Sequence, residues 1–384
     1  MLLSVLLTAE ASYFVGLGEE ITMPTNGTFH RSAPRGDDGW WFFIGAGGSY
    51  VAFEADKDHG YDDRERLDVA ERDDLVDRAI TKCPDGTWFI AGSGNLDDFN
   101  DSVWVFKADA ELNKTNEDTV AESSSERQHN DMALVCSSVF SGVSFLSNSG
   151  GSDLFEVDSE GSIIEQHHLS DTPGMMGGSM IALEDTGELV LIGRGVEMMS
   201  SEIEIGVYDE ELQRISSKSV ELMAGRTERV WWPQSILKVG DIFLLAYMAR
   251  IEANGDFPAD EGEVWLAVLD SNFDFVESIQ VTDLAGSGAG AMRPGLSRRG
   301  ETLTVSYDVQ VSPRLREVTL DLTGAHVPGD SGDPQDYGDE TGDGSDDSGE
   351  DGGGGGICGC TTGGLGGTGL ALGATLLLWA RRQR

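Results

Sequence analysis

Lysine and arginine are scarce in this chain of 384 residues, which holds 26 of them against 68 aspartates and glutamates. The formal net charge is therefore -42 at pH 7. Phosphate groups repel such a polyanion, so nucleic acids are excluded as partners and anionic membrane surfaces are poor ones.

Familiar catalytic motifs are absent as well. The chain holds no Gly-x-Ser-x-Gly elbow, no phosphate-binding P-loop, no HExxH and no CxxC motif. Paired carboxylates occur throughout so acidic a chain, so no single pair stands out for acid–base catalysis. These absences favour a protein that binds over one that catalyses.

Cysteine is limited to four residues, two in the body and two near the C-terminus. Cys83 and Cys136 are 53 residues apart, which places them on equivalent strands of neighbouring repeats if the repeat described below is correct. An exported chain could oxidise them. The sequence leaves two alternatives open, a disulfide bond and two buried thiols.

No long stretch shows the 3.6-residue periodicity of an amphipathic helix, and short apolar runs dominate instead. One apolar run recurs and each copy ends in an aspartate: Asp56, Asp109, Asp158, Asp209, Asp270 and Asp321. The spacings are 53, 49, 51, 61 and 51 residues. Several short strands in each unit of about 50 residues predict an all-β fold, a β-propeller of about six four-stranded blades over residues 12–324.

The second repeat shows the expected layout of a blade. Residues 79–83 are predicted as the inner strand, 87–92 as the second, 102–108 as the third and 118–122 as the outer one. The Pro84-Asp85-Gly86 turn joins the first two.

The sixth repeat has no outer strand of its own after Leu322. Residues 13–22 are left over at the other end of the chain. We predict that they supply the missing strand and close the ring, which removes an exposed sheet edge.

The C-terminal region predicts export and anchoring. Residues 325–356 are rich in Asp and Gly, and 330–351 hold ten carboxylates with no Lys or Arg, which predicts a disordered stalk. Residues 361–380 are uncharged and are followed by an arginine cluster. A helix of about 20 residues spans the hydrocarbon core, with its basic end in the cytoplasm.

Within residues 357–384, Cys358-Gly359-Cys360 precedes this Gly/Leu-rich helix and the arginines. That order resembles the MYXO-CTERM sorting signal of myxobacterial surface proteins. The resemblance implies a sorting protease that removes the helix near the cysteines, with Cys358 and Cys360 as processing or lipidation residues. It also implies display on the outer envelope of a Gram-negative bacterium. The alternative is an uncut transmembrane anchor.

Residues 1–11 are consistent with export. They combine a short apolar run with Ala9-Glu10-Ala11, which fits the small-x-small cleavage pattern, but no basic residue precedes the run. A signal peptide that lacks its first residues explains this, and a first strand of the fold is the alternative.

Ligands of propellers commonly sit at the mouth of the central channel, where loops enter the inner strands. Those loops here carry arginines, aromatics and a histidine: Arg127, His129, Arg229, Trp231, Trp232 and Arg293. Such side chains could bind a carboxylate or the face of a sugar by bidentate hydrogen bonds and stacking. Alternatively, the tryptophans pack between blades and the arginines pair with local acids.

Calcium is the cofactor that the sequence indicates, through one acidic loop. Asp56, Asp58, Asp62 and Asp63 offer the spaced oxygen ligands that a hard cation needs, without the EF-hand order. Because Asp56 is also one of the strand-ending aspartates, a plain aspartate-containing turn is the competing and preferred explanation. The adjacent His167 and His168 fall on a predicted outer strand, where solvent-facing imidazoles are expected.

Taken together, these features predict a cell-surface, membrane-anchored β-propeller that acts as a non-enzymatic binding or scaffold module for a glycan or a protein. The alternative is a secreted propeller hydrolase or lyase that acts on extracellular polysaccharide. Its first candidate residues are Arg127, His129, Arg229 and Arg293.

Overall fold

The computed structural model describes residues 12–23, 28–35, 39–46, 49–56, 66–71, 75–94, 102–122, 132–146, 151–170, 172, 174–194, 201–224, 228–251, 262–284, 287–310 and 312–323. Most of these residues are in β-strands, and none of them is helical. The predicted signal peptide, stalk and sorting segment lie outside the described residues. Within the described residues, no helix has the length and apolar character needed to cross a membrane.

The described strands form six antiparallel sheets, which confirms the predicted all-β, six-bladed propeller. Blade I holds β3 (Thr28–Arg35), β4 (Gly39–Ala46), β5 (Ser49–Asp56) and β6 (Arg66–Glu71). Blade II holds β7 (Leu75–Lys82), β8 (Trp88–Gly94), β9 (Ser102–Ala108) and β10 (Lys114–Glu122). Blade III holds β11 (Met132–Cys136), β12 (Ser141–Leu146), β13 (Ser152–Val157) and β14 (Ile163–Leu169).

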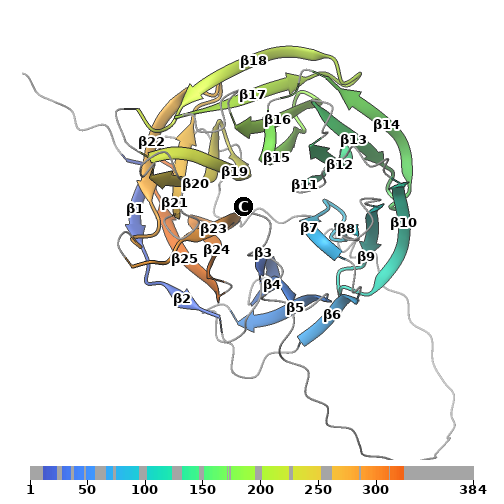
Figure 1. Cartoon of the computed structure of the whole chain (residues 1–384), viewed down its shortest axis with the longest axis horizontal. Helices are drawn as coiled ribbons and strands as arrows, with labels where there is room; N and C mark the ends of the chain where they lie inside the picture. Colours follow the sequence, from blue (N-terminus) through green and yellow to red (C-terminus); the bar gives the residue numbers. More distant parts are fainter. Residues whose placement is uncertain are drawn as a thin grey trace, which may run out of the picture. The chain divides into compact units, whose positions relative to one another are not determined.

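The remaining blades follow in chain order. Blade IV holds β15 (Gly174–Leu183), β16 (Glu188–Arg194), β17 (Glu202–Tyr208) and β18 (Arg214–Glu221). Blade V holds β19 (Glu228–Val239), β20 (Ile242–Ile251), β21 (Gly262–Leu269) and β22 (Phe275–Gln280). Blade VI holds β23 (Ala291–Arg299), β24 (Thr302–Val309) and β25 (Ser312–Leu320), together with β1 (Phe14–Leu17) and β2 (Ile21–Thr22). The six blades lie around a common centre, with the first strand of each nearest to it (Figure 1).

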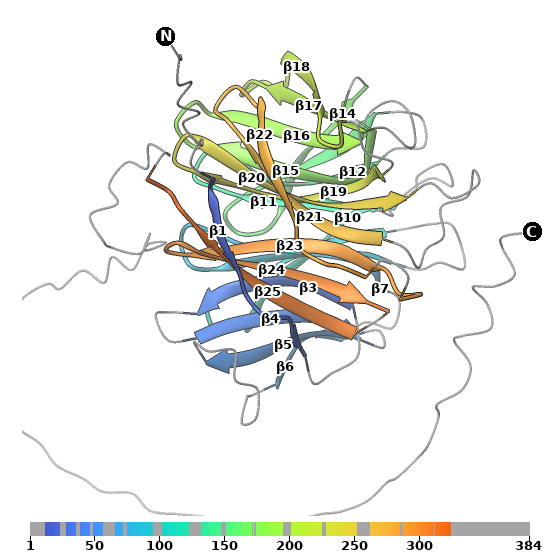
Figure 2. The ribbon, with the colours of Figure 1, turned by 90° about the vertical axis from the view of Figure 1, so that its left-hand side faces the viewer.

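The N-terminal strands close the ring as predicted. Both β1 and β2 pair antiparallel with β25, and β1 crosses this region of blade VI in Figure 2. Between them, the carboxylate of Glu20 accepts a hydrogen bond of 2.7 Å from the hydroxyl of Tyr307 and another from the guanidinium of Arg314. Burial, and then this contact with Glu20, raise the pKa of Tyr307 far above its ordinary value. The first and last strands of the body are thus joined by side chains as well as by backbone.

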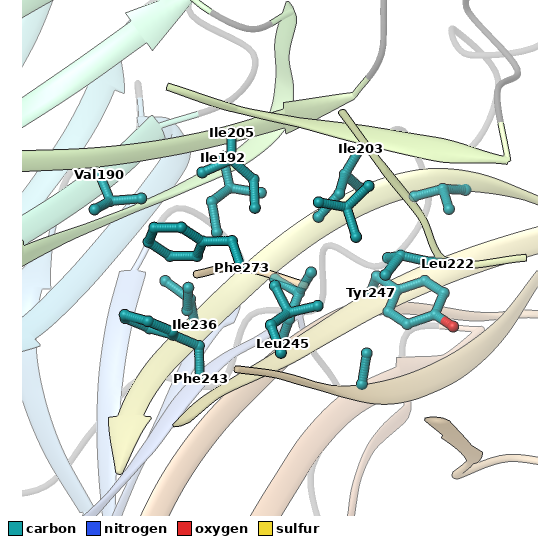
Figure 3. Packing of buried hydrophobic residues seen from close by; sticks show 14 of the residues in the cluster. Val190, Ile192, Ile203, Ile205, Leu222, Ile236, Phe243, Leu245, Tyr247 and Phe273 are labelled. Atoms are coloured by element: carbon teal, nitrogen blue, oxygen red, sulfur yellow. The ribbon is translucent and has the colours of Figure 1, made fainter. Parts of the chain in front are cut away.

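Most of the core lies between blades, where neighbouring sheets face each other. Between blades IV and V, Ile192 and Ile205 pack in one cluster with Leu245 and Phe243 (Figure 3). The ring of Phe243 stacks on that of Phe273 with centroids 4.5 Å apart. Each such side chain contributes about 1.5–3 kcal/mol when fully buried, which explains why β20 and β21 are nearly continuous apolar runs.

Among the described residues, four of the strand-ending aspartates each begin a tight turn. Asp209 Oδ1 accepts hydrogen bonds from the backbone N–H groups of Glu211 (3.1 Å) and Gln213 (2.8 Å). The residue between them, Leu212, has φ +58° and a buried side chain. The same pattern recurs in the turns that begin at Asp109, Asp158 and Asp270. In these four blades the recurring aspartate therefore stabilises a hairpin between the third and outer strands, as the preferred explanation for Asp56 implied.

The outer strand of blade II begins earlier than predicted for this reason. β10 starts at Lys114 rather than at residue 118, because the turn at Asp109 returns the chain into the sheet at once. The other three strands of this blade lie where the sequence placed them, within a few residues at each end.

Cys83 and Cys136 form a disulfide bond with their Cα atoms 5.0 Å apart. Cys83 directly follows β7, and Cys136 is the last residue of β11, so the bond joins the inner strands of blades II and III. Of the two alternatives that the sequence left open, the structure shows the disulfide bond.

Candidate functional site

Two of the predicted ligand-binding residues lie at the same end of the propeller. Arg229 is the second residue of β19, and Arg293 is the third residue of β23. We call this the loop end, because each blade's chain enters its inner strand there. Both side chains are partly buried, and they belong to neighbouring blades whose inner strands pack together.

Two further arginines that the sequence analysis missed lie at the loop end. Arg250 is the direct cross-strand partner of Arg229 in the pairing of β20 with β19. Arg194 is the last residue of β16 in the adjacent blade IV. The side chains of both are buried, with 6% of each residue exposed. The sequence could have indicated them, because in two successive repeats an arginine stands at or next to the end of the apolar second strand.

Arg293 has an unusual backbone conformation. Its φ is +54°, it precedes Pro294, and it falls in an irregular stretch of the pairing between β23 and β24. Left-handed conformations are costly for a residue with a Cβ atom, and they cluster at functional sites. The guanidinium lies 3.7 Å from the carboxylate of Asp308, which is 1% exposed. A buried acid on β24 therefore helps to position this arginine.

Buried carboxylates complete the loop end. Glu263 on β21 accepts hydrogen bonds from the hydroxyl of Thr282 and from the backbone N–H of Leu284, the latter at 2.6 Å. Asp153 on β13 lies 2.9 Å from Nδ1 of His168, whose side chain is 47% exposed. The ring of His168 faces solvent, as expected for an outer strand, and a buried acid also orients it.

The distribution of buried charge distinguishes this end from the other. Among the described residues, every charged residue that is buried lies within two positions of the loop end of its strand: Asp153, Arg194, Arg250, Glu263 and Asp308. The opposite end carries the aspartate turns instead. Buried charges are costly unless they are paired, so their concentration at one end marks it as the candidate site.

The other predicted ligand-binding and metal-binding side chains lie outside the described residues. Arg127 and His129 lie outside the described residues, as do the side chains of Trp231 and Trp232, whose backbone is part of β19. Of the proposed calcium ligands, Asp58, Asp62 and Asp63 and the side chain of Asp56 also lie outside the described residues. The predicted sorting residues Cys358 and Cys360 also lie outside the described residues.

A different group of potential metal ligands is present on blade III. One ligand atom from each of Glu156, Glu165 and His167 lies within 4.8 Å of the other two. These residues are on β13 and β14, away from the loop end arginines.

Comparisons with known proteins show the fold. No protein-family model and no curated protein sequence matches the chain. A triple arginine-to-alanine mutant of AofleA from Arthrobotrys oligospora matches with a TM-score of 0.51 at 9% identity, over 79% of this chain and 88% of that chain. A neuraminidase-like protein of A/little yellow-shouldered bat/Guatemala matches with a TM-score of 0.46 at 12% identity, over 80% and 98%. Streptogramin B lyase matches with a TM-score of 0.43 at 10% identity, over 78% and 97%.

Proposed function

We propose that the protein is a surface-displayed, non-enzymatic β-propeller whose loop end binds a glycan or protein that carries carboxylate groups. The concentration of buried charge at that end carries the proposal. Arginines from blades IV, V and VI occur there in a chain whose net charge is -42. A guanidinium recognises a carboxylate by two parallel hydrogen bonds, and partial burial strengthens such a contact.

The test is a binding screen with substitutions at the two partly exposed arginines. The probes are acidic oligosaccharides that bear carboxylates and neutral oligosaccharides of matched length. We expect Arg229→Gln and Arg293→Gln each to weaken binding of the acidic probes by about tenfold or more, because each loses a charged hydrogen bond.

Arg214→Gln provides the matched control. Arg214 lies on β18 at the opposite end of its blade and pairs with Glu204 at 2.7 Å. Its loss should leave the affinity unchanged. Equal weakening in all three variants, or no binding of acidic probes by the unmodified protein, would contradict the proposal.

The pairing of Asp153 with His168 favours one alternative, a hydrolase or lyase acting on extracellular polysaccharide. A histidine held by a buried carboxylate and open to solvent has the arrangement of a general base. Release of reducing ends from an acidic polysaccharide, abolished in His168→Gln, would establish this alternative over the binding module.

Export and surface anchoring are part of the proposal. A disulfide between Cys83 and Cys136 is consistent with an oxidising compartment, and the C-terminal sequence resembles a sorting signal. Intact-mass analysis of the protein from its native envelope tests this part. A mass ending near Cys358 supports processing by a sorting protease, whereas a mass that retains Arg384 supports an uncut anchor.

A further inference from the structure

A carboxylate–imidazole cluster lies on one face of blade III. Glu156 on β13 is the direct cross-strand partner of Glu165 on β14, and His167 follows two positions later on the same strand. Side chains at alternate positions of a strand share a face, so these three project to the same side. Leu154, directly opposite His167, packs in a cluster with Leu189 of blade IV, which identifies this face as the one toward blade IV.

The imidazole is directed at the two carboxylates. His167 Nε2 lies 3.6 Å from an oxygen of Glu156 and 3.9 Å from an oxygen of Glu165. These separations exceed normal hydrogen-bond lengths. The Nε2 atom is nevertheless buried, and within the described part of the chain it makes no hydrogen bond. Within the described residues, a buried ring nitrogen that makes no hydrogen bond therefore faces two acids.

The two glutamates also repel each other. Like charges directly opposite on neighbouring strands destabilise a sheet. The side chain of Glu156 is 34% exposed and that of Glu165 is 66% exposed. Among the described residues, neither glutamate forms an ion pair with a lysine or arginine. A cation held between them would relieve this repulsion.

We propose that Glu156, Glu165 and His167 bind a divalent transition-metal ion of the zinc type. Ligand bonds of about 2.1 Å in a tetrahedral site place neighbouring ligand atoms about 3.4 Å apart. His167 Nε2 lies 3.6 and 3.9 Å from the two carboxylates, and all three ligand atoms lie within 4.8 Å of one another. One imidazole nitrogen with two carboxylate oxygens suits zinc, whereas calcium prefers six to eight oxygens. Solvent has access through Glu165 and supplies the remaining position.

The neighbouring histidine offers a matched control. His168 is on the opposite face of β14, where it pairs with Asp153. The variants His167→Gln and His168→Gln therefore each remove one imidazole, from adjacent positions. Only His167→Gln should weaken the binding of zinc.

The experiment is calorimetric titration of the metal-stripped, full-length protein with zinc chloride. We expect one site that is weakened at least about tenfold in His167→Gln and in Glu165→Gln, since even outer-shell partners of a metal change affinity 10–100-fold. The site should persist in His168→Gln. Zinc should also raise the Tm of the unmodified protein and of His168→Gln but not of His167→Gln, a readout that holds if a variant is less stable.

Three results would overturn the proposal. The first is an unchanged zinc isotherm in His167→Gln, which would place any zinc elsewhere on the acidic surface. The second is the absence of a saturable site in the unmodified protein, which would leave only an ion pair between a charged imidazole and the glutamates. The third is an equal, His167-dependent rise in Tm with calcium, which would reject the transition-metal assignment.

Discussion

At the residue scale, the strand-ending aspartates act on the backbone of the turn that follows. One carboxylate oxygen satisfies two N–H groups that the hairpin would otherwise leave without partners. Two of the turns are further held by a lysine of the preceding blade. Lys107 donates to the carbonyl of Ser159, and Lys218 donates to that of Asn272 at 2.7 Å. In these four blades, the hydrogen bonds of the turn are enough to explain the repeated aspartate.

Asp209→Ala tests this role. We expect the free energy of unfolding to fall by about 1–2 kcal/mol, because two backbone donors lose their acceptor. Asp209→Asn keeps an acceptor oxygen and should lose less. The exposed Glu211→Ala serves as the control, since only its backbone takes part in the turn. Denaturant unfolding measures all three, and equal losses would show that the carboxylate is not responsible.

At the element scale, two connections tie blades together beyond their hydrophobic contacts. The disulfide joins the inner strands of blades II and III across 53 residues of sequence. The second connection is β1–β2, which adds the N-terminal strands to blade VI.

Removing the disulfide should destabilise the body. We expect Cys136→Ser to lower the free energy of unfolding by about 2–4 kcal/mol, because the bond limits the freedom of the unfolded chain. Reduction of the unmodified protein with dithiothreitol should lower its Tm to about that of Cys136→Ser. The reductant should have no effect on the Tm of Cys136→Ser itself. An effect of reductant on the variant as large as on the unmodified protein would contradict the assigned pairing.

The closure predicts a dependence on alkaline pH. The pKa of Tyr307 is raised in the folded state, first by burial and then by Glu20, so folding favours the neutral phenol. Its stabilising contribution is complete below the unfolded pKa of about 10 and is lost as pH rises above that value. Tyr307→Phe should cost about 1–3 kcal/mol near pH 7, where the hydrogen bond to a charged acceptor is lost.

The difference between the unmodified protein and Tyr307→Phe should then shrink above pH 10. Unfolding free energies measured from pH 7 to 11 check this. Tyr247→Phe is a suitable control, because that buried hydroxyl donates to the sulfur of Met223. A difference that stays constant to pH 11 would show that Tyr307 is not the titrating group.

At the scale of the whole molecule, the excess of acidic residues opposes compaction. The whole chain has a net charge of -42, and its acidic groups repel one another. At 0.1 M ionic strength, salt largely screens the repulsion between exposed charges that are more than about 10 Å apart. The loop end, in contrast, gathers arginines from three successive blades.

Raising sodium chloride from low to physiological concentration and beyond should therefore raise Tm. The physical reason is screening of like charges, so potassium chloride at equal ionic strength should act equally. A Tm that falls with salt would mean that attractive ion pairs outweigh the net repulsion. Thermal unfolding followed by circular dichroism decides between the two.

The all-β fold, the six repeats, their hairpins and the strand that closes the ring could all be predicted from the sequence. These features follow from local signals, namely the alternation of apolar residues, turn residues such as Gly86 and Gly187, and a period near 50. The tertiary structure alone decided what depends on register and on the contact between blades. Examples are the bond between Cys83 and Cys136, the placement of Arg229 opposite Arg250, and the gathering of buried charge at one end. Residues far apart in the chain come into contact only when each blade packs against its neighbours, and local sequence patterns do not predict those contacts.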